Sequence, residues 1–563
     1  MDIKQSVYKY ALQNALKFDG KANQGAVIGK VLAEHPTFKS KVKEIAKEAS
    51  EAIKKISKMS LDKIREELEV LAPELLEKKE HEKKGLHDLE KAETGKVVMR
   101  LAPYPSGPLH IGNARPAILN DEYVKKYDGK LLMIIDDTIG SEEKQLIKEA
   151  FDLIPEGLRW LGVEFEPSII YKSDRLAIYY KYAEELIKKD KAYVCLCAAE
   201  ELRKNRENQK DCEHRKSSVQ ETLKEWKNML TKYKEGEAVL RLKTSMQHPN
   251  PAFRDRVLFR ICEREHPKVG KKYKVWPMLE LSWGIDDHLL GITHVIRGKE
   301  LMMESEMEKF IWDIFGWQHP VLIHTGLLRL EGVKISKSKS SKEVLSGEYK
   351  GWDDPRTWSL QSLKRRGIKP EAIRKFILSF GLTQTEITVP VDILYSENRK
   401  LIEKEANRYF FVEDPKEIKI EKAPIQVCEL DLHPDFKERG VREFDAFNKF
   451  YIANGDLKQL NDNKLYRLMD CLNFKKVKDK FVFESLEYEK YKDKGDRIMH
   501  WLPAGEELAN VEILMDDGSI KKGLAEKSVK DLSEGTIVQF ERFAFCRLDK
   551  KEKDKIVFWF AHK

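Results

Sequence analysis

The chain has 563 residues, of which 41% are hydrophobic and 35% charged, so it is too long for one hydrophobic core and too apolar for a disordered chain. Its net charge of +8 permits a polyanionic partner without requiring one, because phosphate binding depends on local basic patches. Seven scattered cysteines argue against a disulfide framework, and neither a signal peptide nor an apolar membrane span is recognisable, so we expect a cytoplasmic protein.

Residues 1–92 predict an N-terminal helical appendage. Apolar residues recur at helical spacing from Val42 to Ile56, and Ser60 has the type and position of an N-cap for a second helix that begins at Leu61. The charged run from Glu77 to Lys84 is most simply a solvated linker.

A parallel α/β layer is expected to begin at residue 93. Val97 to Leu101 is a short apolar run that ends in a Pro/Gly loop, a helical pattern follows, and a second apolar run from Leu131 to Ile135 ends at Asp136. Strand, helix and strand in this order predict a right-handed parallel unit with its ligand at the carboxyl ends of the strands.

The remaining sequence predicts a catalytic layer interrupted by another domain. Residues 195–290 mix short strands with turns and separate the halves 93–194 and 291–345. Residues 346–412 are again helical in pattern, and residues 413–563 alternate short apolar runs with Gly and Asp turns, as in all-β barrels or sandwiches.

Two loops carry residues suited to phosphate chemistry. The Gly/Pro loop from Pro105 to Arg115 lies between a strand and a helix, where backbone amides and His110 could meet phosphate oxygens. The polar loop from Lys334 to Lys339 offers mobile cations and hydroxyls to a triphosphate. Taken singly, a structural histidine in a turn and an exposed basic loop explain these segments as well.

Together, His110-Ile-Gly-Asn113 and Lys334-Ile-Ser-Lys-Ser338 resemble the paired HIGH and KMSKS motifs of class I aminoacyl-tRNA synthetases. Further segments are similar to the glutamyl and glutaminyl branch of that family. They are Asp136 to Thr138, Asn250 to Asp255, Ile285 to Gly291, His294 to Glu300, Trp352 to Trp358, Arg497 to Pro503 and Gln539 to Phe543. The stretch from Ala192 to Cys197 favours the archaeal glutamyl type.

The resemblance implies a Rossmann-type catalytic domain split by an acceptor-stem-binding insertion, a helical stem-contact domain, and C-terminal β-barrels that bind the anticodon. It implies a monomeric enzyme of protein synthesis that uses ATP and Mg²⁺ to ligate glutamate to the 3′-terminal adenosine of tRNA(Glu) through a glutamyl-adenylate, with no membrane partner. Charging of tRNA(Gln) is left open. A glutaminyl-tRNA synthetase and a non-catalytic tRNA-binding relative remain as alternatives.

The resemblance also assigns site residues. Catalysis is assigned to His110, Lys334 and Lys337. ATP binding is assigned to His110, Gly112, Asn113, Lys334, Ser336, Lys337 and Ser338. Amino-acid binding is assigned to Arg100, Asp136 and Arg297, because a guanidinium can hold both oxygens of a carboxylate and an acid can hold the ammonium.

The chain departs from the family pattern in the amino-acid pocket. Ile134 and Ile139 stand where family members have an arginine and an aspartate, and Leu279 stands where they have a tyrosine. Asn113 replaces the last histidine of the first motif, and Tyr104 replaces a small polar residue. These changes bear on glutamate specificity more than on synthetase activity.

A zinc site is the last prediction. Cys195-x-Cys197 and Cys212-x-His214 supply three thiolates and one imidazole, a set suited to tetrahedral zinc, and glutamyl enzymes of several lineages carry a similar pair. Four protein ligands leave no open position, so the ion would be structural. The alternative is four unrelated residues, since the usual two-residue spacer is absent.

Overall fold

The computed structural model describes residues 3–17, 20, 22–35, 38, 41–72, 75, 86–140, 145–333 and 337–563. The chain forms two compact units, Met1–His87 and Asp88–Lys563. The predicted linker from Glu77 to Lys84 lies outside the described residues.

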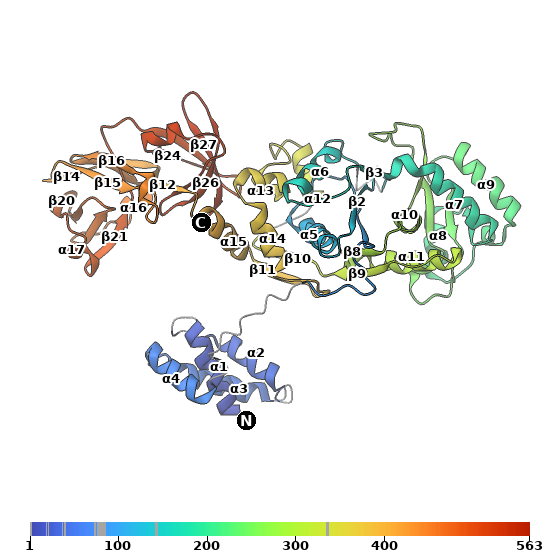
Figure 1. Cartoon of the computed structure of the whole chain (residues 1–563), viewed down its shortest axis with the longest axis horizontal. Coiled ribbons are helices and arrows are strands. Elements are labelled where there is room, and N and C mark those ends of the chain that lie inside the picture. The colour runs from blue at the N-terminus through green and yellow to red at the C-terminus, as the bar shows by residue number, and fades with distance from the viewer. Residues whose placement is uncertain are drawn as a thin grey trace. The chain divides into compact units, whose positions relative to one another are not determined.

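The smaller unit is helical, as predicted (Figure 1). Its helices are α1 (Ile3–Lys17), α2 (Gln24–Glu34), α3 (Val42–Ile56) and α4 (Leu61–Leu71). Helix α4 begins after Ser60 because the Ser60 Oγ accepts a hydrogen bond from Lys63 N at 3.4 Å and so satisfies an amide without a helical partner. The four helices share one core, which includes Val7, Leu12 and Ile45.

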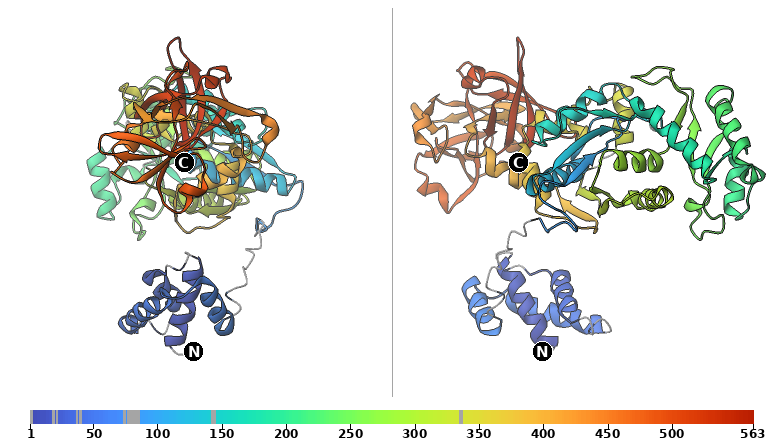
Figure 2. Two further views of the ribbon diagram at one scale, coloured as in Figure 1. Left: turned by 90° about the vertical axis from the view of Figure 1, so that its left-hand side faces the viewer. Right: turned by 45° about the vertical axis from the view of Figure 1, so that its right-hand side comes forward.

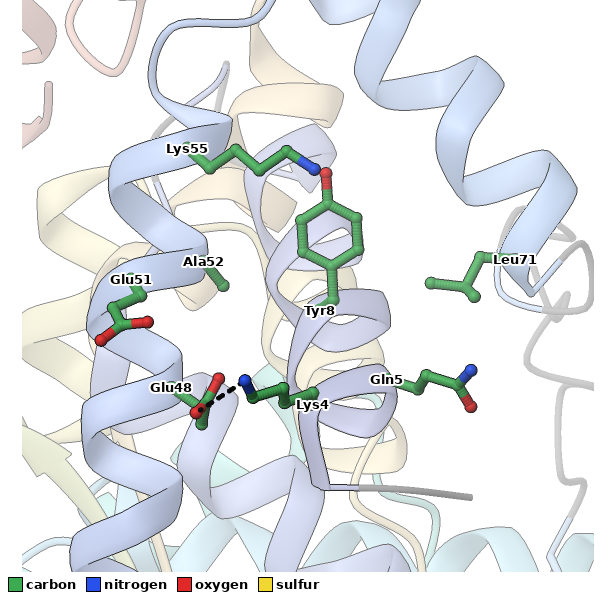
Figure 3. A pocket seen from close by; sticks show the side chains of 8 residues that line it. All are labelled: Lys4, Gln5, Tyr8, Glu48, Glu51, Ala52, Lys55 and Leu71. Atoms are coloured by element: carbon green, nitrogen blue, oxygen red, sulfur yellow. Dashed lines mark ion pairs between the residues drawn. The ribbon is translucent and has the colours of Figure 1, made fainter.

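A hollow of about 340 Å³ opens on this helical unit (Figure 3). Lys4 of α1 forms an ion pair with Glu48 of α3 at 3.7 Å, and Lys55 lies 4.5 Å from the centroid of the Tyr8 ring. The Tyr8 hydroxyl donates to Glu67 at 2.6 Å. These contacts tie α1 to α3 and α4.

The larger unit contains the predicted parallel layer. It is built from β1 (Val98–Leu101), α5 (Ile111–Lys126), β2 (Lys130–Ile135), α6 (Ala150–Trp160), β3 (Ile170–Tyr171), β8 (His294–Gly298) and β9 (Val321–Thr325). Strands β1, β2 and β3 pair in parallel, and so do β8 and β9. The start of β8 adjoins β1, because Thr293 N donates to Val98 O at 2.9 Å. The strand, helix and strand order is therefore confirmed.

An insertion interrupts this layer, as predicted (Figure 2). Its elements are α7 (Leu176–Lys188), β4 (Ala192–Cys195), α8 (Ala199–Glu207), α9 (Val219–Thr231), β5 (Val239–Leu242), β6 (Val257–Ile261) and β7 (Val275–Pro277). Strands β4 to β7 form an antiparallel sheet. Its core runs on into α10 (Leu279–Leu289) and α11 (Met302–Phe315), so the insertion and the layer share one apolar interior.

A helical stretch connects the layer to the C-terminal region. It contains β10 (Leu328–Glu331), α12 (Lys337–Leu345), α13 (Leu360–Arg366), α14 (Pro370–Leu378), β11 (Ile387–Pro390) and α15 (Asp392–Ile402). Strands β10 and β11 pair in parallel, and α14 packs on α5. Within residues 346–412 the structure contains the helices α13, α14 and α15, together with the strand β11.

The C-terminal region is built from strands, as predicted. They are β12 (Asn407–Tyr409), β13 (Phe411–Glu413), β14 (Pro415–Glu421), β15 (Gln426–Asp431), β16 (Val441–Ala446), β17 (Lys449–Ala453), β18 (Leu465–Leu468), β19 (Asn473–Val477), β20 (Lys480–Ser485), β21 (Gly495–Met499), β22 (Leu502–Pro503), β23 (Ala509–Leu514), β24 (Ile520–Ala525), β25 (Ile537–Phe540), β26 (Ala544–Lys551) and β27 (Ile556–His562), with the short helices α16 (Asn454–Leu457) and α17 (Glu489–Lys492). They form two seven-stranded sheets and the β15–β16 ribbon. Trp501 and Phe545 are buried core aromatics.

In the described parts of the chain, every helix is too short or too polar to span a lipid bilayer.

Candidate functional site

His110 lies where the Gly/Pro loop meets α5, and it caps that helix. Its Nδ1 accepts a hydrogen bond from Gly112 N at 3.1 Å, while Asn113 Oδ1 accepts one from His110 N at 3.3 Å. A Cβ on residue 112 would lie 2.9 Å from the His110 ring, so glycine makes room for the imidazole. With Nδ1 accepting, a neutral ring carries its proton on Nε2 and can donate to an acidic oxygen.

The first amides of α5 already have acceptors inside the chain. Ile111 N donates to Trp358 O at 3.3 Å, and Asn113 N donates to His110 O at 2.8 Å. The loop was expected to present open backbone amides to a phosphate. In the structure these amides are bonded within the chain, and the positive end of the helix remains as the feature of the loop that favours an anion.

Helix α12 contacts the loop that leads to His110. Lys334 and Ser336 lie outside the described residues, and Lys337 and Ser338 begin α12. Ser341 Oγ, on the same helix, donates to Ser106 O at 2.9 Å. The start of this helix and the first loop, more than two hundred positions apart in the sequence, therefore belong to one region of the fold.

Residues 352–360 hold the His110 loop from another side. Leu360 N donates to Leu109 O at 2.8 Å, and Trp358 takes a left-handed backbone conformation with φ of 52°. A Cβ on Gly107, whose φ is +143°, would lie 3.0 Å from the Trp352 ring. The loop is thus shaped by a segment from beyond the parallel layer.

That same segment continues into α13, which is bonded to the C-terminal sheet. Arg365 forms a two-point ion pair with Asp549 at 2.7 Å, and the buried Arg366 donates to Phe560 O at 3.2 Å and Ala561 O at 2.8 Å. Residues 358–366 therefore link the His110 loop to β27, because they are hydrogen-bonded to the loop at one end and to β27 at the other.

A second group of functional side chains surrounds Trp283 of α10. The charged ends of Arg100, Lys172 and Arg297 lie 5.1, 5.0 and 5.3 Å from the centroid of the Trp283 ring. Each of the three is buried, and each comes from or directly follows a parallel strand: β1, β3 and β8. The layer thus gathers three cations on one aromatic ring, and we call this the Trp283 cluster.

Two arginines of the Trp283 cluster each form a two-point ion pair with one carboxylate. Arg100 pairs with Asp287 through Nε and through Nη2, the latter at 2.9 Å. Arg297 pairs with Glu308 through Nη1 at 2.9 Å and Nη2 at 2.7 Å. Burial raises the pKa of Glu308, and the Arg297 charge opposes that rise.

The third cation, Lys172, is held differently. Its Nζ donates to Asp136 Oδ2 at 3.2 Å and to the Ser282 hydroxyl at 2.7 Å, and its side chain is fully buried. Burial lowers the pKa of Lys172, while Asp136 works in the opposite direction. Asp136 also accepts from Thr138 Oγ1 at 2.9 Å, and its amide donates to Pro103 O at 3.1 Å, close to the His110 loop.

The Trp283 cluster has no net formal charge, but some of its N–H donors have no hydrogen-bond acceptor. The formal charges of Arg100, Lys172 and Arg297 cancel those of Asp136, Asp287 and Glu308. Two buried atoms of these described residues have no hydrogen-bond partner, Arg297 Nε and Trp283 Nε1, and both are donors. A ligand rich in acceptors, such as a carboxylate, would satisfy them.

The structure therefore brings Arg100, Asp136 and Arg297 together, as the sequence suggested. Ile134 is buried in β2, and Leu279 is half-buried at the start of α10. Lys172 and Trp283 were not foreseen. Lys172 directly follows β3, at the edge where parallel sheets place their ligands, but β3 has only two residues and left no periodic signal in the sequence.

The four predicted zinc ligands converge beside β4. Their ligand atoms all lie within 4.8 Å of one another. Cys195 Sγ is 3.7 Å from Cys212 Sγ, and Cys197 Sγ is 3.6 Å from His214 Nδ1. A tetrahedral site with zinc–sulfur bonds of about 2.3 Å places neighbouring sulfurs about 3.8 Å apart, so the spacing fits.

The surroundings of these cysteines also suit a metal. Arg241 Nη1 lies 3.8 Å from both Cys195 Sγ and Cys212 Sγ, and its charge would offset the extra negative charge of three thiolates on a dication. The hydrogen bond with the Cys195 thiol is the largest cause that lowers the pKa of Cys212.

Three family models match this chain. The model described as "tRNA synthetases class I (E and Q), catalytic domain" matches residues 96–404. Two models described as "anti-codon binding domain" of the same synthetases match residues 406–489 and 477–549. Together they span the parallel layer, the insertion, the connecting helices and most of the C-terminal strands.

Curated proteins similar to this chain are named glutamate–tRNA ligases. Those of Pyrococcus furiosus, Methanobrevibacter smithii and Methanocaldococcus jannaschii are 46%, 42% and 42% identical, each over 100% of both chains. A solved glutamate tRNA ligase from Elizabethkingia meningosepticum covers 55% of this chain and 70% of its own at 19% identity and a TM-score of 0.39, so it adds nothing to the full-length matches.

Proposed function

This chain belongs to the class I tRNA synthetases of the glutamate and glutamine branch, and from that membership we propose that it is a glutamate–tRNA ligase that uses ATP. The observation that carries the proposal is the identity of 46% over the whole length of a glutamate–tRNA ligase. A contact supports it: Ser341 Oγ of α12, the helix that begins at Lys337, donates to Ser106 O in the loop that leads to His110.

The proposed reaction has two steps. A carboxylate oxygen of glutamate bonds to the α-phosphorus of ATP while the bond to pyrophosphate breaks. A ribose hydroxyl of the terminal tRNA adenosine then attacks the carbonyl carbon of the glutamyl-adenylate, and AMP leaves. Neither step needs a protein nucleophile, so catalysis rests on positioning and on cations that meet the charge developing on the phosphates.

The ATP site in this proposal is the His110 loop together with the start of α12. His110 donates from Nε2 to phosphate oxygens, Gly112 lets the adenine lie against backbone, and the side-chain amide of Asn113 assists. Cations and hydroxyls from the second motif stabilise the departing pyrophosphate together with magnesium. They are Lys334, Ser336, Lys337 and Ser338.

The amino-acid site in this proposal is the Trp283 cluster. Asp136 holds the α-ammonium, because it lies next to the His110 loop and so places the α-carboxylate near ATP. Arg100 and Arg297 offer guanidinium donors to an acidic substrate, and their pairs with Asp287 and Glu308 fix their orientation.

The test is ATP–pyrophosphate exchange with glutamate or glutamine, with and without total archaeal tRNA. We expect at least about tenfold preference for glutamate in the presence of tRNA, equivalent to about 1.4 kcal/mol in the transition state. Preference for glutamine would make the chain a glutaminyl enzyme. Exchange with neither amino acid would instead favour a tRNA-binding relative without catalysis.

The cysteine cluster supports a structural zinc ion in the same enzyme. Cys195, Cys197, Cys212 and His214 would hold it, and it would fix the loop after β4 to the segment before α9 without taking part in the reaction. We expect about one zinc per purified chain, and Cys212→Ser should lose most of it. Metal analysis by mass spectrometry checks this, with Cys262→Ser as the matched control, since Cys262 is buried in the same insertion outside the cluster.

Loss of the metal should loosen the insertion locally. Limited proteolysis of Cys212→Ser is expected to cut near the cluster while the C-terminal sheets stay resistant. Equal zinc content in both cysteine variants would contradict the proposed ligand set.

A further inference from the structure

The three cations of the Trp283 cluster are not equally available to a substrate. Arg100 and Arg297 each spend two nitrogens on one carboxylate, the arrangement that holds a guanidinium most firmly. Lys172 touches one carboxylate oxygen at 3.2 Å, and its second partner is the neutral hydroxyl of Ser282. Lys172 is therefore the cation whose pairing an arriving anion can exchange most easily.

We infer that Lys172 binds the side-chain carboxylate of the amino acid and so recognises glutamate. To do this, Lys172 exchanges its contact with Asp136 for a contact with the substrate. This inference rests on the proposed function, in which the substrate ammonium binds Asp136. The ammonium takes the place of Lys172 at Asp136, and Lys172 turns to the carboxylate at the other end of the same molecule. The internal ion pair is thus replaced by two ion pairs with the substrate.

The charges of this exchange balance only for an acidic amino acid. The ammonium and side-chain carboxylate of glutamate together add no net charge, so Asp136 and Lys172 both stay paired. Glutamine offers the ammonium but an uncharged amide, and Lys172 would remain buried without an anionic partner. An unpaired charge in a buried site is strongly unfavourable, so the exchange of ion pairs disfavours the binding of glutamine.

The position of Lys172 suits this role. It follows β3, whereas Asp136 follows the neighbouring strand β2, so the two polar groups stand at adjacent ends of the sheet. The ammonium of Lys172 lies 5.0 Å from the Trp283 ring centroid, and the residues around that ring carry two buried donors without partners, Trp283 Nε1 and Arg297 Nε. The cluster thus offers a carboxylate one singly paired cation and two unsatisfied N–H groups.

The experiment compares Lys172→Met with the wild-type chain in tRNA-dependent pyrophosphate exchange, using glutamate and glutamine in parallel. We expect kcat/KM for glutamate to fall about 100-fold while kcat/KM for glutamine rises, because the cation that the amide would leave unpaired is gone. The KM for ATP should stay the same. Lys172→Arg should recover part of the preference for glutamate because it restores the charge.

The matched control is Lys9→Met in the helical unit. Lys9 is also a buried lysine with a single carboxylate partner, Glu34 at 2.6 Å, but it lies in the other compact unit of the chain. Its loss should leave the ratio between the two amino acids unchanged. If the ratio of glutamate to glutamine activity falls in Lys172→Met but not in Lys9→Met, the loss of a buried ion pair is not in itself the cause.

Lys172→Met leaves Asp136 buried without a cation and could unfold the site, so Lys172→Met/Asp136→Asn is the second variant. Both partners are then neutral, and the ratio of glutamate to glutamine activity should still fall about 30-fold. A ratio equal to wild type in either folded variant would overturn the inference. If the wild-type chain itself fails to activate glutamate, the proposed function fails first and the inference with it.

Discussion

Replacing His110 by asparagine should lower tRNA-dependent pyrophosphate exchange about 100-fold, because removal of one preorganised donor to a developing negative charge typically costs that much. Asparagine is chosen because it is among the best N-cap residues, so it can keep the cap of α5 that His110 provides through Nδ1. We expect the fall in kcat, with little change in the KM for glutamate.

His110→Ala is the companion variant that removes the ring and the cap together. It should lose a similar factor in rate and about 1 kcal/mol of stability in addition, measured as a lower unfolding temperature. An asparagine variant with full exchange activity would mean that the ring serves only to cap α5. In that case the motif histidine of this chain would be structural.

The second large effect is expected at Asp287. Changing it to asparagine leaves the Arg100 guanidinium, whose side chain is 4% exposed, without an ionised partner. The free energy of unfolding should fall by about 3–5 kcal/mol, the usual result of breaking a buried pair from one side. Urea unfolding followed by tryptophan fluorescence measures this.

A double variant separates stability from function. Arg100→Met/Asp287→Leu removes both charges and should regain most of the lost stability, because apolar side chains of similar volume replace a buried ion pair well. Exchange activity should stay low, since Arg100 belongs to the proposed amino-acid site. Recovery of both stability and activity would show that the pair only fills space.

The sequence predicted best what depends on neighbours in the chain. Helices α3 and α4, the Ser60 cap and the first two parallel strands follow from local spacing of apolar residues, and the structure confirms them. The site assignments remain predictions, and two of the assigned residues, Lys334 and Ser336, lie outside the described residues.

Contacts between distant segments could not be predicted in this way. Arg100 and Asp287 are 187 positions apart, so no window of sequence contains both. Strand β3 has two residues, too few to show a periodic pattern, and Lys172 therefore gave no sign of ending a strand. Trp283 could be taken for an ordinary apolar residue of a buried helix until its three cationic neighbours were seen.

The hydrogen bonds between residues 358 and 360 and the His110 loop set the minimum length of an active fragment of this enzyme. A chain cut at the end of the parallel layer, near residue 345, would keep every motif residue yet lose the acceptor for Ile111 N and the donor to Leu109 O. Since α13 is in turn bonded to β27, even a cut just before the last strands removes support from the nucleotide side. Amino-acid activation in this protein is therefore a property of nearly the whole larger unit, although the residues that touch substrate occupy a small part of it.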